Sequence, residues 1–401
     1  MRMEAPTIDS PVSFTDTTKA FAHLNDSDLR FNYWIFRLMN SPMLTGISTS
    51  LAEVAMSINF PVSWAAKPTV FRVFCGGETI DESLAVVKTL GVNSVGAILD
   101  YSVEGQESES EFAKTEAELI RIVGIAKGNP DIPVTCMKIS GIASNRLLEK
   151  LSSGADLDDP EKVLSGVLHK RFERICQANF DAGVPVYVDA EESWIQPAID
   201  RLVESMMAKF NTEKAIVFQT VQMFRHDRLA YYNDLILKAR RSGFKVGVKV
   251  VRGAYLDKEN KRASEGGYPT PIQASKQATD QAYNDAMKLS VENIDWVEVC
   301  AGTHNEYSLQ YLAWLMKENG LQNDHPNIYF SQLYGMSDYM SFNLASDGYN
   351  VSKYLPYGPV KFTLPYLIRR AKENTAIAGQ MGKEFTMILK ERNRRKVLAY
   401  K

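Results

Sequence analysis

The sequence predicts an α/β protein in which eight parallel strands and their intervening helices close into a (βα)8 barrel of the TIM type. Eight short runs rich in β-branched residues follow residue 92, and helix-length amphipathic segments separate them. Such alternation indicates parallel strands with right-handed crossovers, either in a barrel or in a doubly wound sheet. Eight units and the lack of a Gly-x-Gly-x-x-Gly fingerprint favour the barrel.

The elements are predicted from these runs in chain order. The strands are Ser94 to Tyr101, Val134 to Ser140, Val184 to Asp189, Ala215 to Gln219, Lys245 to Val251, Trp296 to Cys300, Asn327 to Gln332 and Tyr349 to Leu355. The helix candidates are Ser110 to Ala126, Asp159 to Gly183, Gln196 to Ala208, Tyr231 to Arg241, Thr279 to Glu292 and Ser308 to Asn319.

Three segments follow from this pattern. Residues 1–68 are expected to form an N-terminal helical arm, because aromatic and apolar residues are dense from Phe31 to Leu38 and Pro61 and Pro68 interrupt helices. Residues 69–380 then hold the barrel, and residues 381–401 form a basic C-terminal helical tail. The arm is expected to pack on the barrel or on a partner chain.

Composition sets the broad class of the protein. With 401 residues, 45% hydrophobic and 23% charged, the chain is long enough to bury one sizeable core. The net charge of −2 gives no electrostatic argument for nucleic-acid binding. Neither a Cys-x-x-Cys nor a His-Glu-x-x-His spacing occurs, so no metal site is expected.

The four cysteines and the hydropathy pattern bear on the compartment. Cys75, Cys136, Cys176 and Cys300 lie far apart in apolar contexts, which predicts buried free thiols in a reducing compartment. No apolar stretch approaches the ~18 residues of a membrane span, and the N-terminus has no signal-like apolar segment. A cytoplasmic protein is therefore expected, with peripheral contact at the inner face of the membrane as a further expectation.

A pair of adjacent arginines near the C-terminus is the strongest candidate binding feature. Arg369 and Arg370 follow Pro365 at the start of a predicted helix, where guanidinium groups and the helix dipole favour a carboxylate. Glu373 lies on the same helical face and is expected to orient the pair. For Arg-Arg-x-x-Glu taken alone, a solvated basic turn with an ordinary ion pair is the more common interpretation.

Polar residues recur where the predicted strands end, the edge at which such barrels carry their chemistry. They are Asp100, Tyr101, Glu104, Lys138, Asp189, Glu191, Glu192, Gln219, Lys249, Arg252, Tyr255, Thr303, His304, Asn305, Gln332 and Tyr354. Singly, each has an ordinary structural interpretation: Lys138 snorkels, Asp189 caps a helix and His304 satisfies a loop backbone. Asp200 and most other helix charges are assigned to solvated faces. Jointly, the ring predicts a pocket for a polar ligand with anionic and hydrogen-bonding parts.

These residues resemble those of proline dehydrogenase, an FAD-dependent family that oxidises L-proline to Δ1-pyrroline-5-carboxylate on a distorted βα barrel. The resemblance runs from about Phe71 to Gln380. It rests on Ile98 to Tyr101, Val186 to Glu191, Val251 to Tyr255, Gly302 to Asn305 and Tyr354 to Asn374, in the family's order. The motif from Tyr354 to Asn374 is highly specific, and Arg-Gly-Ala-Tyr is moderately so. Without an aldehyde dehydrogenase signature, the chain resembles a monofunctional member.

The resemblance implies a role for each matching residue. Arg369 and Arg370 correspond to the pair that binds the proline carboxylate, and Glu104 to the carboxylate that pairs with the first arginine as a gate. Other positions match the substrate pocket, namely Lys138, Asp189, Tyr255, Leu333 and Tyr354. Positions that match FAD contacts are Ala190, Gln219, Lys249, Arg252, Gly253, Ala254, Thr303 and His304. Some members have Arg where this chain has Lys249, so the planar fork is lost there while the cation stays.

The chemistry implied is hydride transfer from the proline ring to FAD, with Asp189 and Lys249 as the catalytic candidates. Lys249 or Arg252 supplies positive charge near the flavin, and electrons pass on to a membrane quinone. The basic tail, with Arg392, Arg394, Arg395 and Lys396, is a candidate membrane contact or a solvated helix end. Asp189, Tyr255 and bulk water all remain candidates for accepting the amine proton.

Tyr354 favours proline over hydroxyproline, because its ring would crowd a ring hydroxyl. Three other classes stay open. The first is another flavin barrel enzyme, such as a methylenetetrahydrofolate reductase, against which the arginine pair speaks. The second is a non-catalytic barrel that senses proline, and the third is an interaction protein supported only by the aromatic arm.

Overall fold

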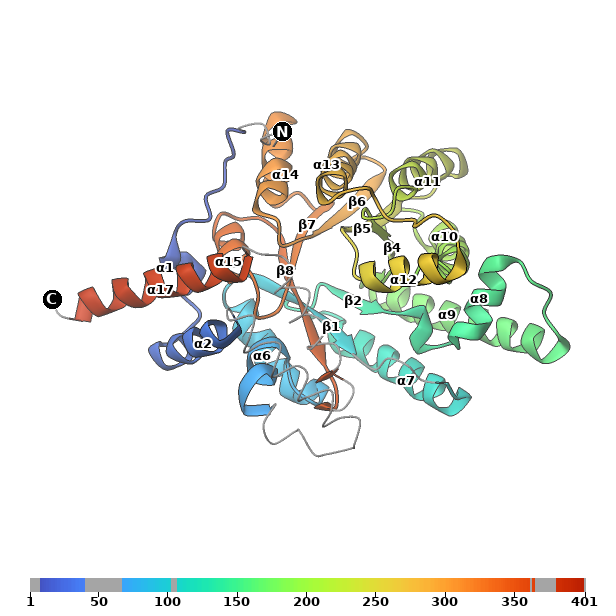
Figure 1. The fold of residues 1–401 in the computed structure, drawn as a ribbon, viewed down its shortest axis with the longest axis horizontal. Coiled ribbons are helices and arrows are strands. Elements are labelled where there is room, and N and C mark those ends of the chain that lie inside the picture. Colours follow the sequence, from blue (N-terminus) through green and yellow to red (C-terminus); the bar gives the residue numbers. More distant parts are fainter. Residues whose placement is uncertain (1–7, 40–66, 102–106, 361–362, 365–379, 400–401) are drawn as a thin grey trace. The chain divides into compact units, whose positions relative to one another are not determined.

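The eight predicted strands form a closed barrel in the order in which they occur along the chain (Figure 1). The computed structural model describes residues 8–39, 67–101, 107–360, 363–364 and 380–399. The strands are β1 (Val95–Tyr101), β2 (Val134–Met137), β3 (Val186–Val188), β4 (Val217–Gln222), β5 (Val246–Val251), β6 (Val297–Gly302), β7 (Ile328–Leu333) and β8 (Val351–Tyr357). The predicted (βα)8 fold is confirmed, and every predicted strand overlaps an observed one.

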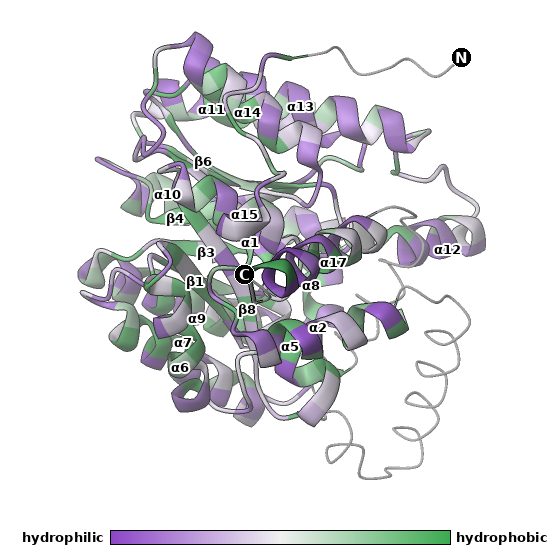
Figure 2. Cartoon of the chain, turned by 90° about the vertical axis from the view of Figure 1, so that its left-hand side faces the viewer, coloured by the Kyte–Doolittle hydropathy of each residue, from purple (hydrophilic) through white to green (hydrophobic). Residues whose placement is uncertain are grey.

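Helices separate the strands as expected. The predicted helices are confirmed as α7 (Glu109–Ala126), α9 (Asp159–Ala182), α10 (Gln196–Phe210), α11 (Arg228–Ser242), α13 (Lys276–Glu292) and α14 (Glu306–Glu318). Further helices are α1 (Thr17–Ala20), α2 (Asp26–Met39), α5 (Arg72–Phe74), α6 (Ile80–Gly91), α8 (Asn145–Ser153), α12 (Leu256–Gly266), α15 (Asp338–Ser346) and α17 (Gln380–Ala399), with short turns η1 (Lys67–Phe71) and η2 (Ile139–Gly141). Hydrophilic and hydrophobic residues mix along the helices, as Figure 2 shows for α13.

The strands are buried on both faces, which explains their apolar, β-branched sequences. Every residue of β2, β4 and β8 is buried, and Val246, Val248 and Val250 of β5 are fully so. The pairings of β1 with β8 and of the neighbours from β2 to β6 are all parallel, as for Phe218 with Gly247. A parallel barrel needs a helical crossover after each strand, and the local signals for these crossovers are clear.

Helix α9 illustrates how the sequence sets these boundaries. Asp158 and Glu161 form a reciprocal capping box at its start, where Asp158 accepts a hydrogen bond from the Glu161 N–H at 2.8 Å. Pro160 occupies the first turn, and Gly183 ends the helix with a φ of 69°. The turn that follows leads directly into β3.

The chain divides into two compact units. The first comprises Met1–Val12, Glu104–Asn129 and Pro133–Phe330, and it contains β2 to β6 with their helices. The second comprises Ser13–Val103, Pro130–Ile132 and Ser331–Lys401. The predicted segment boundaries after residues 68 and 380 stay a prediction.

Within the second unit, the N-terminal helices pack against the last helix. Helix α17 runs beside α2 and contacts α1 (Figure 1). Tyr33 of α2 stacks on Phe385 of α17, with ring centroids 5.3 Å apart. Arg395 of α17 donates hydrogen bonds to the carbonyl oxygens of Phe21 and Leu24. Part of the predicted arm is therefore helical and joined to the C-terminal helix.

A buried ion pair lies in the same unit. Lys353 of β8 is fully buried, and its Nζ lies 2.7 Å from Asp338 Oδ1 and 2.6 Å from the carbonyl oxygen of Met336. Burial opposes ionisation of Asp338, but Lys353 and His23 hold the pKa of that carboxyl well below its usual range. The pair fixes the start of α15 to β8.

All four cysteines are free and buried, as predicted. Burial raises the pKa of the Cys75 and Cys176 thiols far above the ordinary value. These thiols are therefore core side chains in the folded protein.

Candidate active site

The side chains of β2, β3 and β5 alternate between two faces of the sheet. Thr135 of β2 donates to Asn179 of α9 at 2.8 Å, which marks its face as the one covered by helices. On the opposite face, Tyr187 and Phe218 pack with ring centroids 4.9 Å apart. Gly247 makes room there, because a Cβ at this position would lie 2.6 Å from the Phe218 ring. This aromatic layer forms the floor beneath the polar residues at the strand ends.

Asp189 lies between two lysines directly beyond that floor. Its Oδ1 accepts a hydrogen bond from Lys249 Nζ, and its Oδ2 lies 3.4 Å from Lys138 Nζ. Lys249 Nζ is also 5.8 Å from the centroid of the Tyr187 ring. Asp189 and Lys249 are buried, and Lys138 is partly exposed. The structure thus brings three of the predicted residues together, and the trio carries one net positive charge.

A second carboxylate, Glu191, bridges the same two strand ends. Its side chain accepts hydrogen bonds from the Ser140 N–H at 2.9 Å and from the Ser140 hydroxyl. Burial raises the pKa of Glu191 to about 7, although these hydrogen bonds oppose the shift. The sequence pattern placed Glu191 at a strand end but assigned no role to it.

Arg252 is held in a defined orientation at the end of β5. It donates to Asp280 at 2.6 Å, to the Thr303 hydroxyl at 2.5 Å and to the Ser308 hydroxyl at 2.9 Å. Its guanidinium carbon also lies 4.4 Å from the centroid of the Tyr283 ring. Arg252 and Thr303, predicted separately, therefore form one cluster between β5, α13 and α14.

The neighbouring residues include small ones. Gly253 has a φ of +135°, and a Cβ there would lie 2.3 Å from the Phe224 ring, so only glycine fits. Ala254 follows it, and Ala190 lies buried beside Asp189. His304 follows Thr303 in the turn that leads from β6 to α14.

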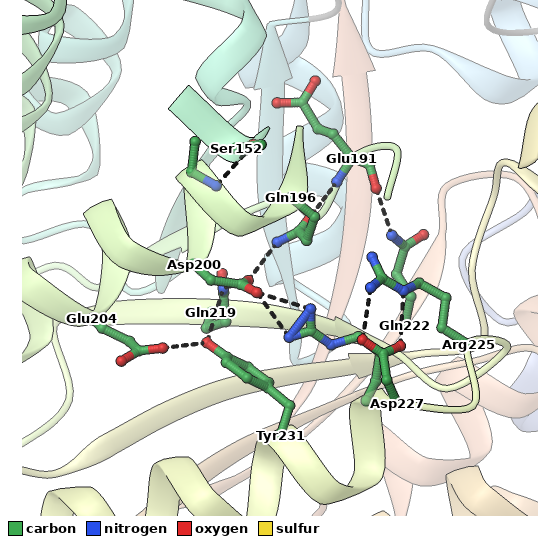
Figure 3. A network of polar contacts seen from close by, with 12 residues as sticks. Ser152, Glu191, Gln196, Asp200, Glu204, Gln219, Gln222, Arg225, Asp227 and Tyr231 are labelled. Carbon is green, nitrogen blue, oxygen red and sulfur yellow. Dashed lines mark hydrogen bonds and ion pairs between the residues drawn. The ribbon is translucent and has the colours of Figure 1, made fainter. Parts of the chain in front are cut away.

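Gln219 lies elsewhere, in a buried network shown in Figure 3. Its Nε2 donates to Asp200 Oδ1 at 2.5 Å and lies 3.4 Å from the Tyr231 hydroxyl. Both partners belong to helices, so the Gln219 side chain is on the helix-covered face of β4. Its predicted contact with FAD stays a prediction, and this position does not favour it.

Asp200 corrects an expectation, because it is buried rather than solvated. Arg228 donates two hydrogen bonds of 2.8 Å to Asp200 Oδ2, and Gln196 donates to Oδ1 at 2.8 Å. Burial raises the pKa of Asp200, and Arg228 opposes that shift. A helix aspartate in sequence looks the same whether it faces water or a neighbouring helix, so the pattern gave no signal.

Three predicted wall residues belong to different units. Tyr255, in the first unit, is buried at the start of α12, and Lys258 Nζ lies 5.4 Å from its ring centroid. Leu333 ends β7 and Tyr354 lies within β8, both in the second unit. Tyr354 is buried, and its carbonyl oxygen accepts the Tyr334 N–H at 2.9 Å.

Four predicted residues lie outside the described residues: Glu104, Arg369, Arg370 and Glu373. Within the ranges that the structure describes, no cluster of three or more His, Cys, Asp or Glu side chains has a metal-binding arrangement. In the same ranges, no helix combines the length and the apolar character needed to cross a membrane.

Comparison with known proteins bears on the family of the chain. The family model of proline dehydrogenase matches residues 83–383. A carbapenem antibiotics biosynthesis protein CarD of Pectobacterium carotovorum is 35% identical over 82% of this chain and 85% of its own length. Mitochondrial proline dehydrogenase 1 of Dictyostelium discoideum is 29% identical over 95% of this chain and 74% of its own length.

A solved structure supports the fold. Proline utilization A from Bdellovibrio bacteriovorus, inactivated by N-propargylglycine, superposes with a TM-score of 0.71 at 22% identity over 92% of this chain. This chain spans only 39% of that larger protein. At this level of identity, the likeness concerns the barrel architecture alone.

Proposed function

The chain belongs to the proline dehydrogenase family, and from this premise we propose that it oxidises L-proline to Δ1-pyrroline-5-carboxylate with FAD as the hydride acceptor. The observation that carries the proposal is Asp189 held between Lys138 and Lys249 at the end of parallel strands. A carboxylate suits the substrate amine, and the lysines suit negative charge on the substrate or cofactor.

The residues present fit FAD. Lys249 and Arg252 are two cations at the end of β5, and such charges would stabilise the negative charge that a bound flavin gains on reduction. Ala190, Gly253 and Ala254 add little side-chain bulk beside the two cations, and Thr303 and His304 offer hydrogen-bonding groups. The bound flavin would supply the two-electron acceptor that no side chain provides.

The chain's own residues position proline for that transfer. Arg369 and Arg370 bind the substrate carboxylate, which fixes the ring in one orientation. Glu373 orients the arginines, and Glu104 pairs with Arg369 to cover the bound substrate. The resemblance assigns Tyr255, Leu333 and Tyr354 to the substrate pocket, where aromatic and apolar side chains would exclude water.

Asp189 then accepts a hydrogen bond from the substrate amine. Its two lysine partners keep the carboxylate in a fixed position, so no reorganisation is required when substrate binds. Lys138 is the partly exposed lysine of the two.

Electron transfer to a membrane quinone completes the proposed cycle, with α17 as the membrane contact. Exposed Val397 and Leu398 beside Lys396 support this assignment. Arg394 and Arg395 support it less, because both donate to Glu391 at 2.7 to 2.8 Å. Arg392 lies 3.8 Å from the centroid of the Tyr33 ring, so it is also engaged within the second unit.

The test is an absorption spectrum of the purified protein, recorded anaerobically while L-proline is added. We expect a bound flavin that proline bleaches, and loss of bleaching in an Arg370→Met control that still holds flavin. A yellow protein that proline does not bleach would contradict the substrate assignment. A colourless protein that FAD cannot reconstitute would contradict the cofactor assignment, and bleaching by NADH instead would point to a nicotinamide-dependent flavin enzyme.

A further inference from the structure

Two hydrogen-bonded contacts join the ends of β2 and β3 side by side. The strands are parallel, with Met137 paired to Val188, so the next positions along each chain also face one another. Lys138 contacts Asp189 at 3.4 Å, and two residues further Ser140 contacts Glu191. Ser140 belongs to the short turn η2 that follows β2, and Glu191 follows β3, so the second contact lies just beyond the two strand ends. The second contact is a continuation of the first.

The Ser140–Glu191 contact is the better shielded of the two. Glu191 is only 3% exposed, and both its carboxylate oxygens bond to Ser140, one to the N–H at 2.9 Å and one to the hydroxyl. The N–H bond is to the backbone, so it fixes the path of the chain that carries Lys138.

The backbone of Glu191 is itself held by hydrogen bonds to two glutamine side chains. Its N–H donates to Gln196 Oε1 at 2.8 Å, and its carbonyl oxygen accepts from Gln222 Nε2 at 2.8 Å (Figure 3). Gln196 donates in turn to Asp200, which Arg228 holds with two hydrogen bonds. Both backbone groups of Glu191 are therefore anchored to buried side chains of α10 and β4.

We propose that Glu191 is a positioning residue, which holds the β2 end against the β3 end through Ser140 and so keeps Lys138 beside Asp189. Lys138 has a long and partly exposed side chain, and such a side chain loses much rotational freedom when it is held in one place. The Ser140 backbone, two residues from Lys138, is fixed by its hydrogen bond to Glu191, and this lowers the entropic cost of holding the Lys138 side chain. The consequence for catalysis rests on the proposed function, whereas the consequence for Lys138 does not.

The test measures Lys138 directly, through its rate of acylation by an amine-reactive reagent, read by mass spectrometry on the full-length protein. Glu191→Ala removes both contacts with Ser140, and we expect Lys138 to label about tenfold faster. Glu191→Gln keeps an acceptor for the N–H and a donor for the hydroxyl, so its labelling rate should stay near that of the wild type. Ser140→Ala keeps the N–H bond and should give an intermediate rate.

Glu298→Ala is the matched control. Glu298 is a partly buried carboxylate of β6 that accepts the Ala215 N–H at 2.6 Å, at the opposite end of the strands. Its loss also costs a hydrogen bond between β6 and the residues before β4, but it should leave Lys138 labelling unchanged. If Lys138 is acylated equally fast in Glu298→Ala and in Glu191→Ala, the effect comes from a general loss of stability, and the proposal is overturned.

Turnover with L-proline and an artificial acceptor gives the second measurement. In Glu191→Ala, kcat/KM should fall about tenfold, and in Glu191→Gln it should stay within about threefold of wild type. If wild-type protein does not oxidise proline, the proposed function fails while the labelling series still decides the role of Glu191. If wild type turns over and Glu191→Ala matches it in labelling and in kcat/KM, the positioning role alone is wrong.

Discussion

At the scale of single residues, the candidate site depends on buried charges that compensate one another. Asp189 is tolerated in the interior because Lys138 and Lys249 both contact it. A buried ion pair adds little net stability, but removal of one partner leaves a costly buried charge. The geometry of the site is therefore sensitive to any change in these three side chains.

Tyr354 is the residue at which substrate choice can be tested. In Tyr354→Ser, loss of the ring should make room for a ring hydroxyl, and the serine hydroxyl should offer it a hydrogen-bond partner. We expect the ratio of kcat/KM for hydroxyproline to that for proline to rise about tenfold. Steady-state kinetics with both substrates measure this ratio.

Tyr349→Ser is the control for Tyr354, because Tyr349 is also buried but precedes β8 at the strand's opposite end. It should lower stability without altering the substrate ratio. An unchanged ratio in Tyr354→Ser would remove Tyr354 from the substrate wall.

At the scale of elements, the turn after β5 is the most constrained one in the site. Gly253 combines a φ of +135° with contact to the Phe224 ring, where a Cβ would lie 2.3 Å away. Gly253→Ala should therefore cost about 1–3 kcal/mol of stability and displace Arg252, which precedes it. We expect a lower melting temperature and a reduced ratio of FAD to protein after purification.

Gly267→Ala separates backbone strain from steric clash. Gly267 ends α12 with a φ of +67°, and a Cβ added there would meet no other atom within 4 Å. This variant should lower the melting temperature by a smaller amount, about 1 kcal/mol in stability, and retain its FAD. A Gly253→Ala protein with normal FAD content would show that the turn tolerates displacement.

How well the sequence predicts an element depends on how it is buried. The strands were predictable because burial on both faces demands apolar runs. Helix α12 was missed because its sequence is largely polar, and α15 because eight of its nine residues are buried and no amphipathic period remains. Arg369 and Arg370 lie outside the described residues, so the helix expected to carry them stays a prediction.

The site was predicted in part for similar reasons. Lys138 and Asp189 were identified because a polar residue after an apolar run is visible in sequence, and Lys249 because it is the one charged residue within the apolar run of β5. The predicted end of the fourth strand at Gln219 was three residues early, since β4 continues to Gln222. Three residues is an odd number, so the two glutamines lie on opposite faces, and Gln222 rather than Gln219 reaches Glu191.

At the scale of the whole molecule, buried carboxylates make stability depend on pH. Burial raises the pKa of Glu191 in the first unit to about 7, and burial with the nearby Asp338 charge raises that of Glu384 in the second. A raised carboxyl pKa means that the folded state binds more protons than the unfolded state above the ordinary pKa of 4.5. Stability should therefore decrease as the pH rises from about 5 through 7.

Glu191→Gln tests this dependence, because it removes the titration of Glu191 and keeps the contacts with Ser140. We would measure the free energy of unfolding in urea at pH 5 and at pH 8.5. Between these pH values it should fall by about 3 kcal/mol more in wild type than in the variant. Glu149→Gln, at a half-exposed carboxylate, is the control for the general effect of a Glu→Gln change. Parallel pH profiles for wild type and Glu191→Gln would mean that Glu191 titrates normally.

The pairing of α2 with α17 has a consequence for biosynthesis. The second unit draws on Ser13–Val103 and Ser331–Lys401, and nearly all of the first unit is translated between these two stretches. The first unit can fold during translation, before α17 has been synthesised. Until then the apolar face of α2 has no α17 to pack against. Closing so long a loop is slow, and the waiting segment is the one most exposed to chaperones and to aggregation.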